Sequence, residues 1–358
     1  MLAAILILFK CIYFDKYTLK ELMFVSILVL MGVISYYTSK RGDFLDVILL
    51  IVGSANVNND KLIKLYLAVT IPFLLTAFVC SQTGIIIDYT TVRSENIGMQ
   101  YAERHGFGII YATDFAAHIL FIYISYYYLK YKKRRVNLFD YGLTLLLAYF
   151  LDRYCDARLT ELMLILMLIL FTIACSSQKA KNKLLSKIVV CAFPVSAVII
   201  ILLTFLYNPS NSLWIAFDSI FLSNRLKISN RVLRNYGVPL LGQHLIMQGQ
   251  GFKINGFDAS IGVTYLDSSY IQLLLIYGVF STILTIFMYT LFAKKAVRNN
   301  NITLEMVVIL LAISSIVNQY LISIAYNPFV IAAGTYAIDW IRNNQKQRGL
   351  NQSGEIDA

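Results

Sequence analysis

The chain has 358 residues, of which 58% are hydrophobic and only 14% are charged, and its formal net charge is +11. Several apolar runs reach the roughly 18 residues that mark a transmembrane helix, which excludes a soluble globular protein and predicts an all-α, multi-pass protein of the cytoplasmic (plasma) membrane. The basic residues stand in short clusters at the ends of these runs. Membrane lipids are therefore expected partners, and nucleic acid is not.

The predicted elements begin with a short N-terminal apolar run, residues 2–14. Nine clear spans follow, bounded by charged or turn residues: 21–37, 62–80, 109–129, 138–152, 159–175, 188–207, 268–292, 303–324 and 326–341. Residues 44–56 are shorter than the usual spanning length of about 17. They form either a re-entrant or interfacial segment, which keeps Lys40 and Arg41 inside, or an additional span with the N-terminus outside. The first topology is preferred, so about 10–11 helices are expected.

Four basic clusters fix the orientation of the spans by the positive-inside rule. They are Lys130, Lys132, Lys133, Arg134 and Arg135; Lys179, Lys181, Lys183 and Lys187; Lys294, Lys295 and Arg298; and Arg342, Lys346 and Arg348. Two spans separate successive clusters, which places the loops 81–108, 152–158, 208–266 and 324–326 on the outer face. The predicted organisation is an N-terminal transmembrane bundle with its outer loop, a large extracellular loop, C-terminal transmembrane helices and a cytoplasmic tail: 1–207 with 81–108, 208–266, 267–341 and 342–358.

The large loop 208–266 is predicted to hold two helices. Residues 212–222 have an apolar face and should lie on the outer leaflet, with Trp214 at the level of the headgroups. Ser223 and Asn224 then begin a second helix, which ends at Gly237. This second helix carries three arginines: Arg225, Arg231 and Arg234. Because a guanidinium matches phosphate oxygens with a planar fork of donors, the helix suits a lipid diphosphate, although a solvated face is an equally common use of such residues.

Two ionisable residues are expected inside the membrane. Asp114 and His118 are four residues apart, so they share one face of the predicted span 109–129. An acidic residue in lipid is costly and points to function. The alternative is a structural Asp–His hydrogen bond that fixes helix packing. The five cysteines show no CxxC spacing, and the outer loops lack clustered metal-ligand residues, so neither a disulfide nor a metal site is expected.

Several short motifs between residues 93 and 280 together resemble one family. They are Arg104-His105-Gly106-Phe107-Gly108, Thr113-Asp114-Phe115-Ala116-Ala117-His118, Asp156-Ala157-Arg158-Leu159, Asn224-Arg225-Leu226, Leu241-Gly242 and Tyr265-Leu266-Asp267-Ser268-Ser269-Tyr270. In their order, their spacing and the side of the membrane on which they are expected, they resemble the Wzy-type polysaccharide polymerases of capsule and exopolysaccharide clusters. That family is related to the O-antigen polymerase and ligase group. The N-terminal and C-terminal thirds resemble that family in hydropathy alone.

The resemblance implies a GT-C-like glycosyltransferase that joins repeat units carried on a polyprenyl diphosphate. The reaction is expected on the outer face of the membrane, without a cofactor or an obligatory metal. It implies polyprenyl-diphosphate-linked oligosaccharides as substrates, and flippase and chain-length regulator proteins as partners. A ligase of finished polymer, a lipid-linked oligosaccharide flippase or transporter, and a membrane scaffold are the alternatives. A transporter would place polar residues through the membrane midplane, whereas the ionisable residues here gather at its outer edge.

Glycosyl transfer from a diphosphate requires cations near the leaving group and a base near the acceptor hydroxyl. Candidates for binding the diphosphate are Arg225, Arg231, Arg234, Arg104 and Arg158. Candidates for the catalytic base are Asp267, His244, Asp114 and His118. Tyr265 and Tyr270 are candidates for stacking on sugar rings, and anchoring at the membrane interface is the competing use of these aromatic residues.

Overall fold

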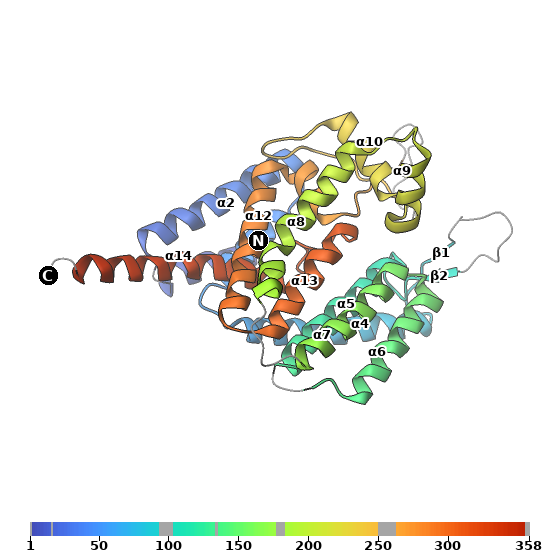
Figure 1. Cartoon of the computed structure of the whole chain (residues 1–358), viewed down its shortest axis with the longest axis horizontal. Helices are drawn as coiled ribbons and strands as arrows, with labels where there is room; N and C mark the ends of the chain where they lie inside the picture. Colours follow the sequence, from blue (N-terminus) through green and yellow to red (C-terminus); the bar gives the residue numbers. More distant parts are fainter. Residues whose placement is uncertain are drawn as a thin grey trace.

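A computed structural model describes residues 2–15, 17–92, 103–132, 135–176, 183–249 and 263–354. The described chain is almost entirely helical (Figure 1). Five of its helices are long and apolar enough to cross a membrane: Leu19–Ser39, Asn59–Gln82, Arg158–Cys175, Lys183–Leu206 and Ser269–Arg298. Their outward faces carry large apolar side chains such as Leu65, Phe73 and Leu202, which are exposed. The all-α membrane class predicted from composition is confirmed.

The N-terminal part consists of α1 (Leu2–Tyr13), α2 (Leu19–Ser39), α3 (Asp43–Gly53) and α4 (Asn59–Gln82). Thr18 and Glu21 form a capping box that begins α2. Helix α3 packs against α1, α2 and α14. Its 11 residues extend about 16 Å at 1.5 Å per residue, roughly half of the hydrocarbon thickness. Helix α3 is therefore too short to span, as expected of a re-entrant or interfacial segment.

The middle of the chain begins with a two-stranded antiparallel hairpin, β1 (Thr90–Val92) and β2 (Glu103–His105). The helices α5 (Ala112–Lys130), α6 (Leu138–Phe150), α7 (Arg158–Ser176) and α8 (Lys183–Leu206) follow, with the π-helical turn η1 (Leu151–Cys155) between α6 and α7. Asp88 braces the hairpin, because its carboxylate accepts from the Phe107 backbone N–H at 2.7 Å and lies 2.7 Å from Nδ1 of His105.

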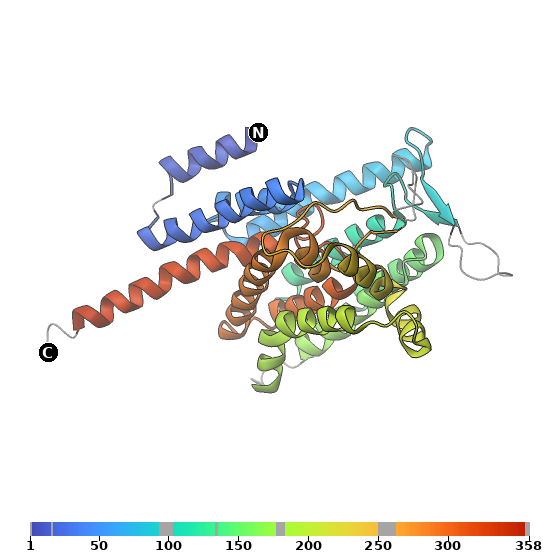
Figure 2. The same cartoon turned by 90° about the horizontal axis from the view of Figure 1, so that it is seen from above.

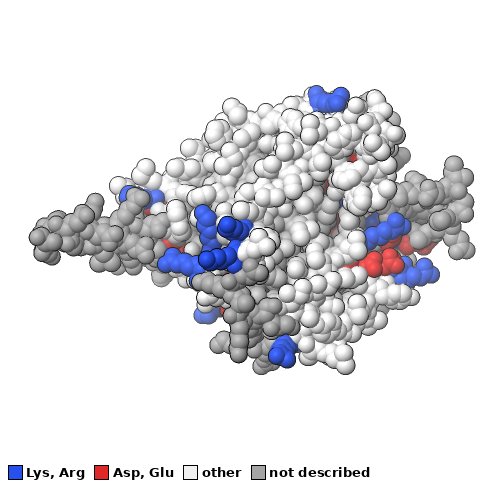
Figure 3. Space-filling view, viewed as in Figure 1, with Lys and Arg blue, Asp and Glu red and all other residues white. Residues whose placement is uncertain are grey.

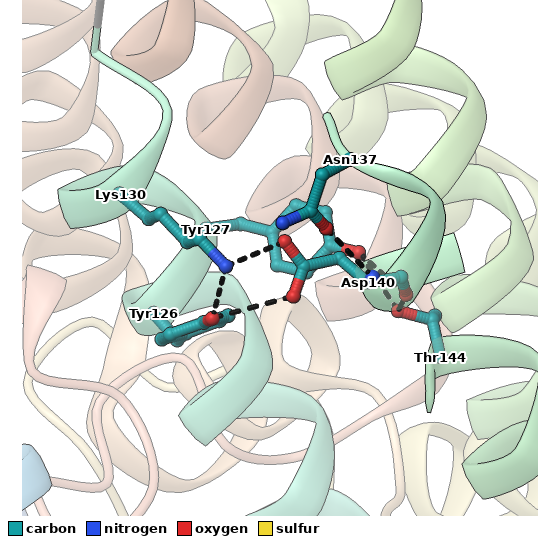
Figure 4. A network of polar contacts seen from close by, with 6 residues as sticks. All are labelled: Tyr126, Tyr127, Lys130, Asn137, Asp140 and Thr144. Atoms are coloured by element: carbon teal, nitrogen blue, oxygen red, sulfur yellow. Dashed lines mark hydrogen bonds and ion pairs between the residues drawn. The ribbon is translucent and has the colours of Figure 1, made fainter. Parts of the chain in front are cut away.

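A polar network joins the C-terminal end of α5 to the N-terminal end of α6 (Figure 4). Lys130 Nζ lies 2.6 Å from the carboxylate of Asp140, which is almost fully buried. The Tyr127 hydroxyl lies 2.8 Å from that of Thr144 and donates to the Asp140 carbonyl at 3.2 Å. A buried carboxylate is stable only when it is paired and hydrogen-bonded, so this network fixes the register of the two helices.

The described part of the loop 208–266 contains the two predicted helices. The first is α9 (Ser212–Phe217) continued by the π-helical turn η2 (Asp218–Leu222), and the second is α10 (Arg225–Tyr236). Leu213, Ile220 and Phe221 are exposed on the first helix, as a helix lying on lipid requires. Helix α10 is tied to α8 by Asn230, whose Nδ2 donates to the Thr204 carbonyl at 2.8 Å. Residues 250–262 of this loop lie outside the described residues.

Asn224 stands at the N-cap position of α10, as predicted, but its side chain does not cap the helix. Asn224 has a left-handed backbone (φ 64°) and makes no side-chain cap bond. The buried carboxylate of Asp218 takes that role instead, accepting from the backbone N–H groups of Leu226 at 3.0 Å and Lys227 at 2.9 Å. The chain reverses between η2 and α10, so a residue eight positions upstream reaches the orphan donors of the helix.

Replacing Asp218 by alanine should therefore lower the free energy of unfolding by about 1–2 kcal/mol, the range for a lost N-cap. The expected readout is a lower midpoint of thermal unfolding of the purified protein in detergent. Asp218→Asn keeps one acceptor oxygen and should give a smaller loss. Equal midpoints for Asp218→Ala and the unchanged protein would mean that α10 does not depend on this cap.

The C-terminal part consists of α11 (Ser269–Gln272), the π-helical turn η3 (Leu273–Tyr277), α12 (Gly278–Arg298), α13 (Ile302–Val317) and α14 (Phe329–Gly354). Helices α8, α12 and α13 pack together, with α7 against α13 and α14 against α12. The continuous span predicted for residues 303–324 is wrong, because α13 ends at Val317. Helix α14 continues to Gly354, so it includes most of the last predicted span, 326–341, and most of the expected tail.

A non-helical segment, residues 318–328, connects α13 to α14 and is partly buried. Neighbouring groups satisfy its backbone. Ser269 N–H donates to the Asn318 carbonyl at 3.0 Å, and the Leu321 carbonyl accepts from Tyr289 at 3.0 Å and Asn327 at 2.8 Å. Irregular backbone at this depth is tolerated only where protein or a cavity surrounds it. The hydropathy signal missed this break because the segment remains largely apolar.

The chain that follows α10 crosses the break between η3 and α12. Gly278 has a φ of 89°, and a Cβ atom there would lie 2.5 Å from the Gly242 backbone N. Only glycine therefore allows the backbone at Gly242 and the backbone at Gly278 to approach so closely. Gln243 then binds the carbonyls freed by the π-helical turn, with its N–H 2.9 Å from Ile276 O and its Nε2 2.9 Å from Leu275 O. The polar loop is thus fixed onto the helical bundle.

In both views of the bundle, α9, α10 and the hairpin lie at one end, and the C-terminal end of α14 points away from them (Figure 1 and Figure 2). We call the end with the hairpin, η1, α9 and α10 the loop end. On the surface, a group of Lys and Arg side chains towards the α14 side is separated from mixed basic and acidic side chains near the loop end by a broad face without charge (Figure 3). This banding suits a protein embedded in lipid.

Candidate active site

Arg225 and Asp267 form an ion pair at the loop end. Nε of Arg225, the first residue of α10, lies 3.1 Å from Oδ2 of Asp267, two residues before α11. The Arg225 side chain is 17% exposed and that of Asp267 37%, so the pair is shielded but reachable. Burial raises the pKa of the Asp267 carboxyl, and the neighbouring guanidinium opposes that rise.

Both partners are held by their surroundings. Asp218 caps α10 and so fixes Arg225, whose Nη1 also donates to the Leu222 carbonyl at 3.4 Å. Asp267 follows a short backbone pairing, in which Thr264 N–H donates to the Gln248 carbonyl at 2.9 Å and the Thr264 hydroxyl accepts from the Gln248 N–H at 3.0 Å. The guanidinium retains donors that neither Asp267 nor Leu222 uses, and these can meet phosphate oxygens.

A second carboxylate lies near this pair. Asp114, in the first turn of α5, accepts a hydrogen bond from the Tyr320 hydroxyl at 2.6 Å, and it interacts electrostatically with Asp267. Tyr320 belongs to the non-helical segment 318–328 and is buried. Two acidic side chains from distant parts of the sequence are therefore brought together, one beside an arginine and one beside a tyrosine.

The alternative reading of Asp114 and His118 as a hydrogen-bonded pair is wrong. The His118 ring stacks on Tyr326, with ring centroids 4.0 Å apart and an interplanar angle of 19°, and its Nδ1 is buried without a hydrogen-bond partner among the described residues. Asp114 instead accepts from Tyr320. Residues four apart share a helix face, but here the segment 318–328 lies over that face and supplies the partners for both side chains.

Tyr265 interacts with both carboxylates. Its hydroxyl is hydrogen-bonded to Gln319 and feels the charge of both Asp114 and Asp267, and burial raises its pKa. Gln319 is itself held by Gln272, whose Nε2 donates to Gln319 Oε1 at 2.9 Å and to the Leu266 carbonyl at 2.6 Å. Tyr265 is thus a neutral hydroxyl beside the acidic groups, which suits contact with a sugar.

The remaining predicted diphosphate ligands lie elsewhere or serve other contacts. Arg231 is exposed and donates to the Val263 carbonyl, and Arg234 is exposed with no side-chain partner among the described residues. Arg104 Nε donates to the Cys155 carbonyl at 2.9 Å, which ties β2 to η1. Arg158 is 64% exposed and lies 3.1 Å from Asp156. Arg225 is the arginine that the structure places beside a catalytic candidate, Asp267.

Two further candidates make other contacts. Nδ1 of His244 lies 3.2 Å from the Ser39 carbonyl at the end of α2, and this contact fastens the loop to the bundle. Tyr270 is fully buried, and its hydroxyl donates to the Ala312 carbonyl of α13 at 3.1 Å. A tyrosine without exposed surface cannot stack on a sugar, so Tyr270 is a packing residue.

The sequence interpretation missed Gln319, Tyr320 and Tyr326, because it assigned 303–324 to one helix and 326–341 to the next. A signal was present: the polar pair Asn318-Gln319 and the helix-breaking pair Asn327-Pro328 interrupt an apolar stretch, and such residues in a membrane segment mark a site or a break.

Two cavities of about 490 and 590 Å³ lie away from these residues and share Asn299 and Asn301 of the α12–α13 connection. Neither is lined by Asp114, Arg225 or Asp267. The described residues contain no group of three or more His, Cys, Asp or Glu side chains placed to hold a metal ion. The carboxylates and Arg225 thus form the group with the clearest capacity for acid–base chemistry.

Comparison of the chain with protein-family models, with curated proteins and with solved structures found no match.

Proposed function

We propose that this protein is a GT-C-like polymerase that joins polyprenyl-diphosphate-linked oligosaccharide repeat units into a surface polysaccharide, with its active site on the extracellular face of the cytoplasmic membrane. The observation that carries the proposal is the shielded pair of Arg225 and Asp267, 3.1 Å apart at the loop end. It combines a phosphate ligand with a base at one place beside the helical bundle.

In the proposed reaction, a sugar hydroxyl of the acceptor attacks the anomeric carbon of the donor repeat unit. The bond from that carbon to the diphosphate oxygen breaks, and the diphosphate leaves with the electron pair. Arg225 stabilises the charge that grows on the leaving group, because its donors are fixed in place before the reaction. Asp267 takes the hydroxyl proton, which its raised pKa favours.

The pairing of Arg225 with Asp267 also supports an order of events. With no donor bound, the guanidinium holds the carboxylate and lowers its basicity. A bound diphosphate competes for the guanidinium and neutralises part of its charge. Asp267 is therefore most basic when the donor is in place, which suits a transferase that must not activate water in the absence of substrate.

The direct test is synthesis by the purified protein in liposomes supplied with lipid-linked repeat units. The proposal requires a ladder of products with two or more repeats and one polyprenyl diphosphate released for each bond formed. Transfer of the oligosaccharide to a different acceptor class without a ladder would identify a ligase. Movement of the lipid-linked unit across the bilayer without covalent change would identify a transporter.

The proposed side of the membrane can be tested by labelling with a membrane-impermeant thiol reagent, after replacement of the native cysteines. Lys227→Cys, at an exposed position of α10, should react in intact cells, and Arg298→Cys, exposed at the end of α12, should react only after permeabilisation. Ser229→Cys is the matched control, because Ser229 is on the same helix as Lys227 but is buried. The opposite labelling of Lys227→Cys and Arg298→Cys would place the pair on the cytoplasmic side and reject the mechanism.

A further inference from the structure

We infer that Asp114 and the residues around it form a subsite for the sugar of the acceptor repeat unit, separate from the diphosphate position at Arg225. The subsite consists of Asp114, Tyr265, Gln319, Tyr320 and Tyr326. This inference rests on the proposed function. It assigns the acceptor sugar to the end of the site at Asp114 and the donor diphosphate to the end at Arg225.

The first support is the geometry of the segment 318–328. It leaves the helical path at Asn318 and presents Tyr320 and Tyr326 towards α5, where Tyr320 meets Asp114 and Tyr326 meets His118. The rings of Tyr320 and Tyr326 lie 4.2 Å apart with an interplanar angle of 32°, and Tyr326 stacks in turn on His118. A break in a membrane helix packed against another interrupted helix, here α11–η3–α12, is a common setting for a substrate site.

The second support is the kind of group that gathers there. A carboxylate, phenol hydroxyls and a primary amide donate and accept hydrogen bonds as sugar hydroxyls require. Among the described residues, Asp114 accepts a hydrogen bond from Tyr320, and the charge that acts on it is the carboxylate of Asp267. Two carboxylates repel a diphosphate, so this end of the site favours a neutral ligand.

The third support is the position of Asp114 relative to the proposed base. The two carboxylates are close enough to interact, and Tyr265 feels both of them. A hydroxyl that donates to Asp114 would be held beside Asp267, with the diphosphate on the far side of Asp267 at Arg225. Asp114 is thus a binding residue that orients the acceptor, and Tyr320 is a positioning residue, because its hydroxyl fixes the Asp114 carboxylate at 2.6 Å.

The test measures binding of a sugar without turnover. The probe is the lipid-free repeat-unit oligosaccharide, released by mild acid from the lipid-linked pool of the producing cells and titrated calorimetrically into the detergent-purified protein. Tyr320→Phe should weaken its binding about tenfold, as expected for a lost hydrogen bond to a charged group. Asp114→Asn, which keeps the shape of the side chain, should weaken it at least as much and provides a second variant should Tyr320→Phe fold poorly.

Two controls separate the subsite from general damage. Tyr127→Phe removes a buried tyrosine hydroxyl from the same helix as Asp114, in the network at the other end of α5, and should bind the oligosaccharide normally. Arg234→Lys, at an exposed position of α10 outside the subsite, should also bind it normally. Unchanged binding by folded Tyr320→Phe and Asp114→Asn, or equal losses in all four variants, would overturn the inference.

The outcome for the subsite is distinguishable from the outcome for the function. If the unchanged protein makes polymer in liposomes but Tyr320→Phe and Asp114→Asn bind the oligosaccharide normally, the subsite is rejected and the polymerase stands. If the protein binds the oligosaccharide through these residues but makes no polymer, the polymerase is rejected and a sugar-binding site stands. If it neither binds nor polymerises, both are rejected.

Discussion

Asp267→Asn is expected to abolish chain extension while single repeat units still reach the lipid carrier, so that the ladder of products collapses to one unit. The change keeps the shape of the side chain and removes its basicity. General-base catalysis by a placed side chain contributes about 10²–10⁴-fold, and the rate of extension in liposomes should fall within that range. The measurement is electrophoresis of the labelled glycan at equal amounts of folded protein.

Asp46→Asn is the matched control for that experiment, because Asp46 is an exposed carboxylate in the first turn of α3 and lies outside the site. It should give a normal ladder. If Asp267→Asn makes full-length polymer while Asp114→Asn makes none at equal abundance, the base is Asp114, and the assignment of Asp267 is wrong.

The pH dependence of extension gives an independent check on the same residue. Asp267 must be deprotonated to act as a base, so the rate should rise with pH through its pKa, which burial raises and Arg225 lowers. Arg225→Gln removes the lowering influence, and the midpoint of the acidic limb should therefore move to higher pH. A midpoint that stays in place, or moves to lower pH, would show that Asp267 does not control this limb.

Arg225→Lys is expected to reduce extension by about 10²–10³-fold, the usual effect of removing one fixed donor from a developing negative charge. Lysine keeps the charge but loses the planar fork of donors and the reach that pairs Arg225 with Asp267 at 3.1 Å. The expected signature is a large loss in the rate with saturating donor, because the arginine acts most strongly on the leaving diphosphate.

Arg234→Lys, on the same helix α10, provides the comparison. Arg234 is exposed and has no side-chain partner among the described residues, so its substitution should leave extension within about twofold of the original, as for surface changes in general. Normal extension by Arg225→Lys at equal abundance would reject the assignment of the diphosphate ligand. An equal loss in both variants would indicate that the whole arginine face, and no single residue, binds the substrate.

The sequence by itself determined the class of the protein and most of its helices, because hydropathy acts over runs of neighbouring residues. Composition required a membrane protein, and α2, α4, α7 and α8 lie close to the predicted spans. The loop helices α9 and α10 were also predictable, since apolar spacing and the terminal Gly237 are local signals. Arg225, Asp267, Asp114 and Tyr265 could be nominated because polar side chains beside lipid are costly.

Only the tertiary structure decided which of those polar residues meet. The cap of α10 comes from Asp218 across a chain reversal, and the partner of Asp114 is Tyr320, 206 residues later in the sequence. The polar pair Asn318-Gln319 marks the break of α13 after Val317, but the break is stable only because groups from α11 and α12 satisfy the freed backbone. Tyr270 and Tyr265 differ in role for the same reason: burial is a property of what packs against a residue, and a local pattern does not contain it.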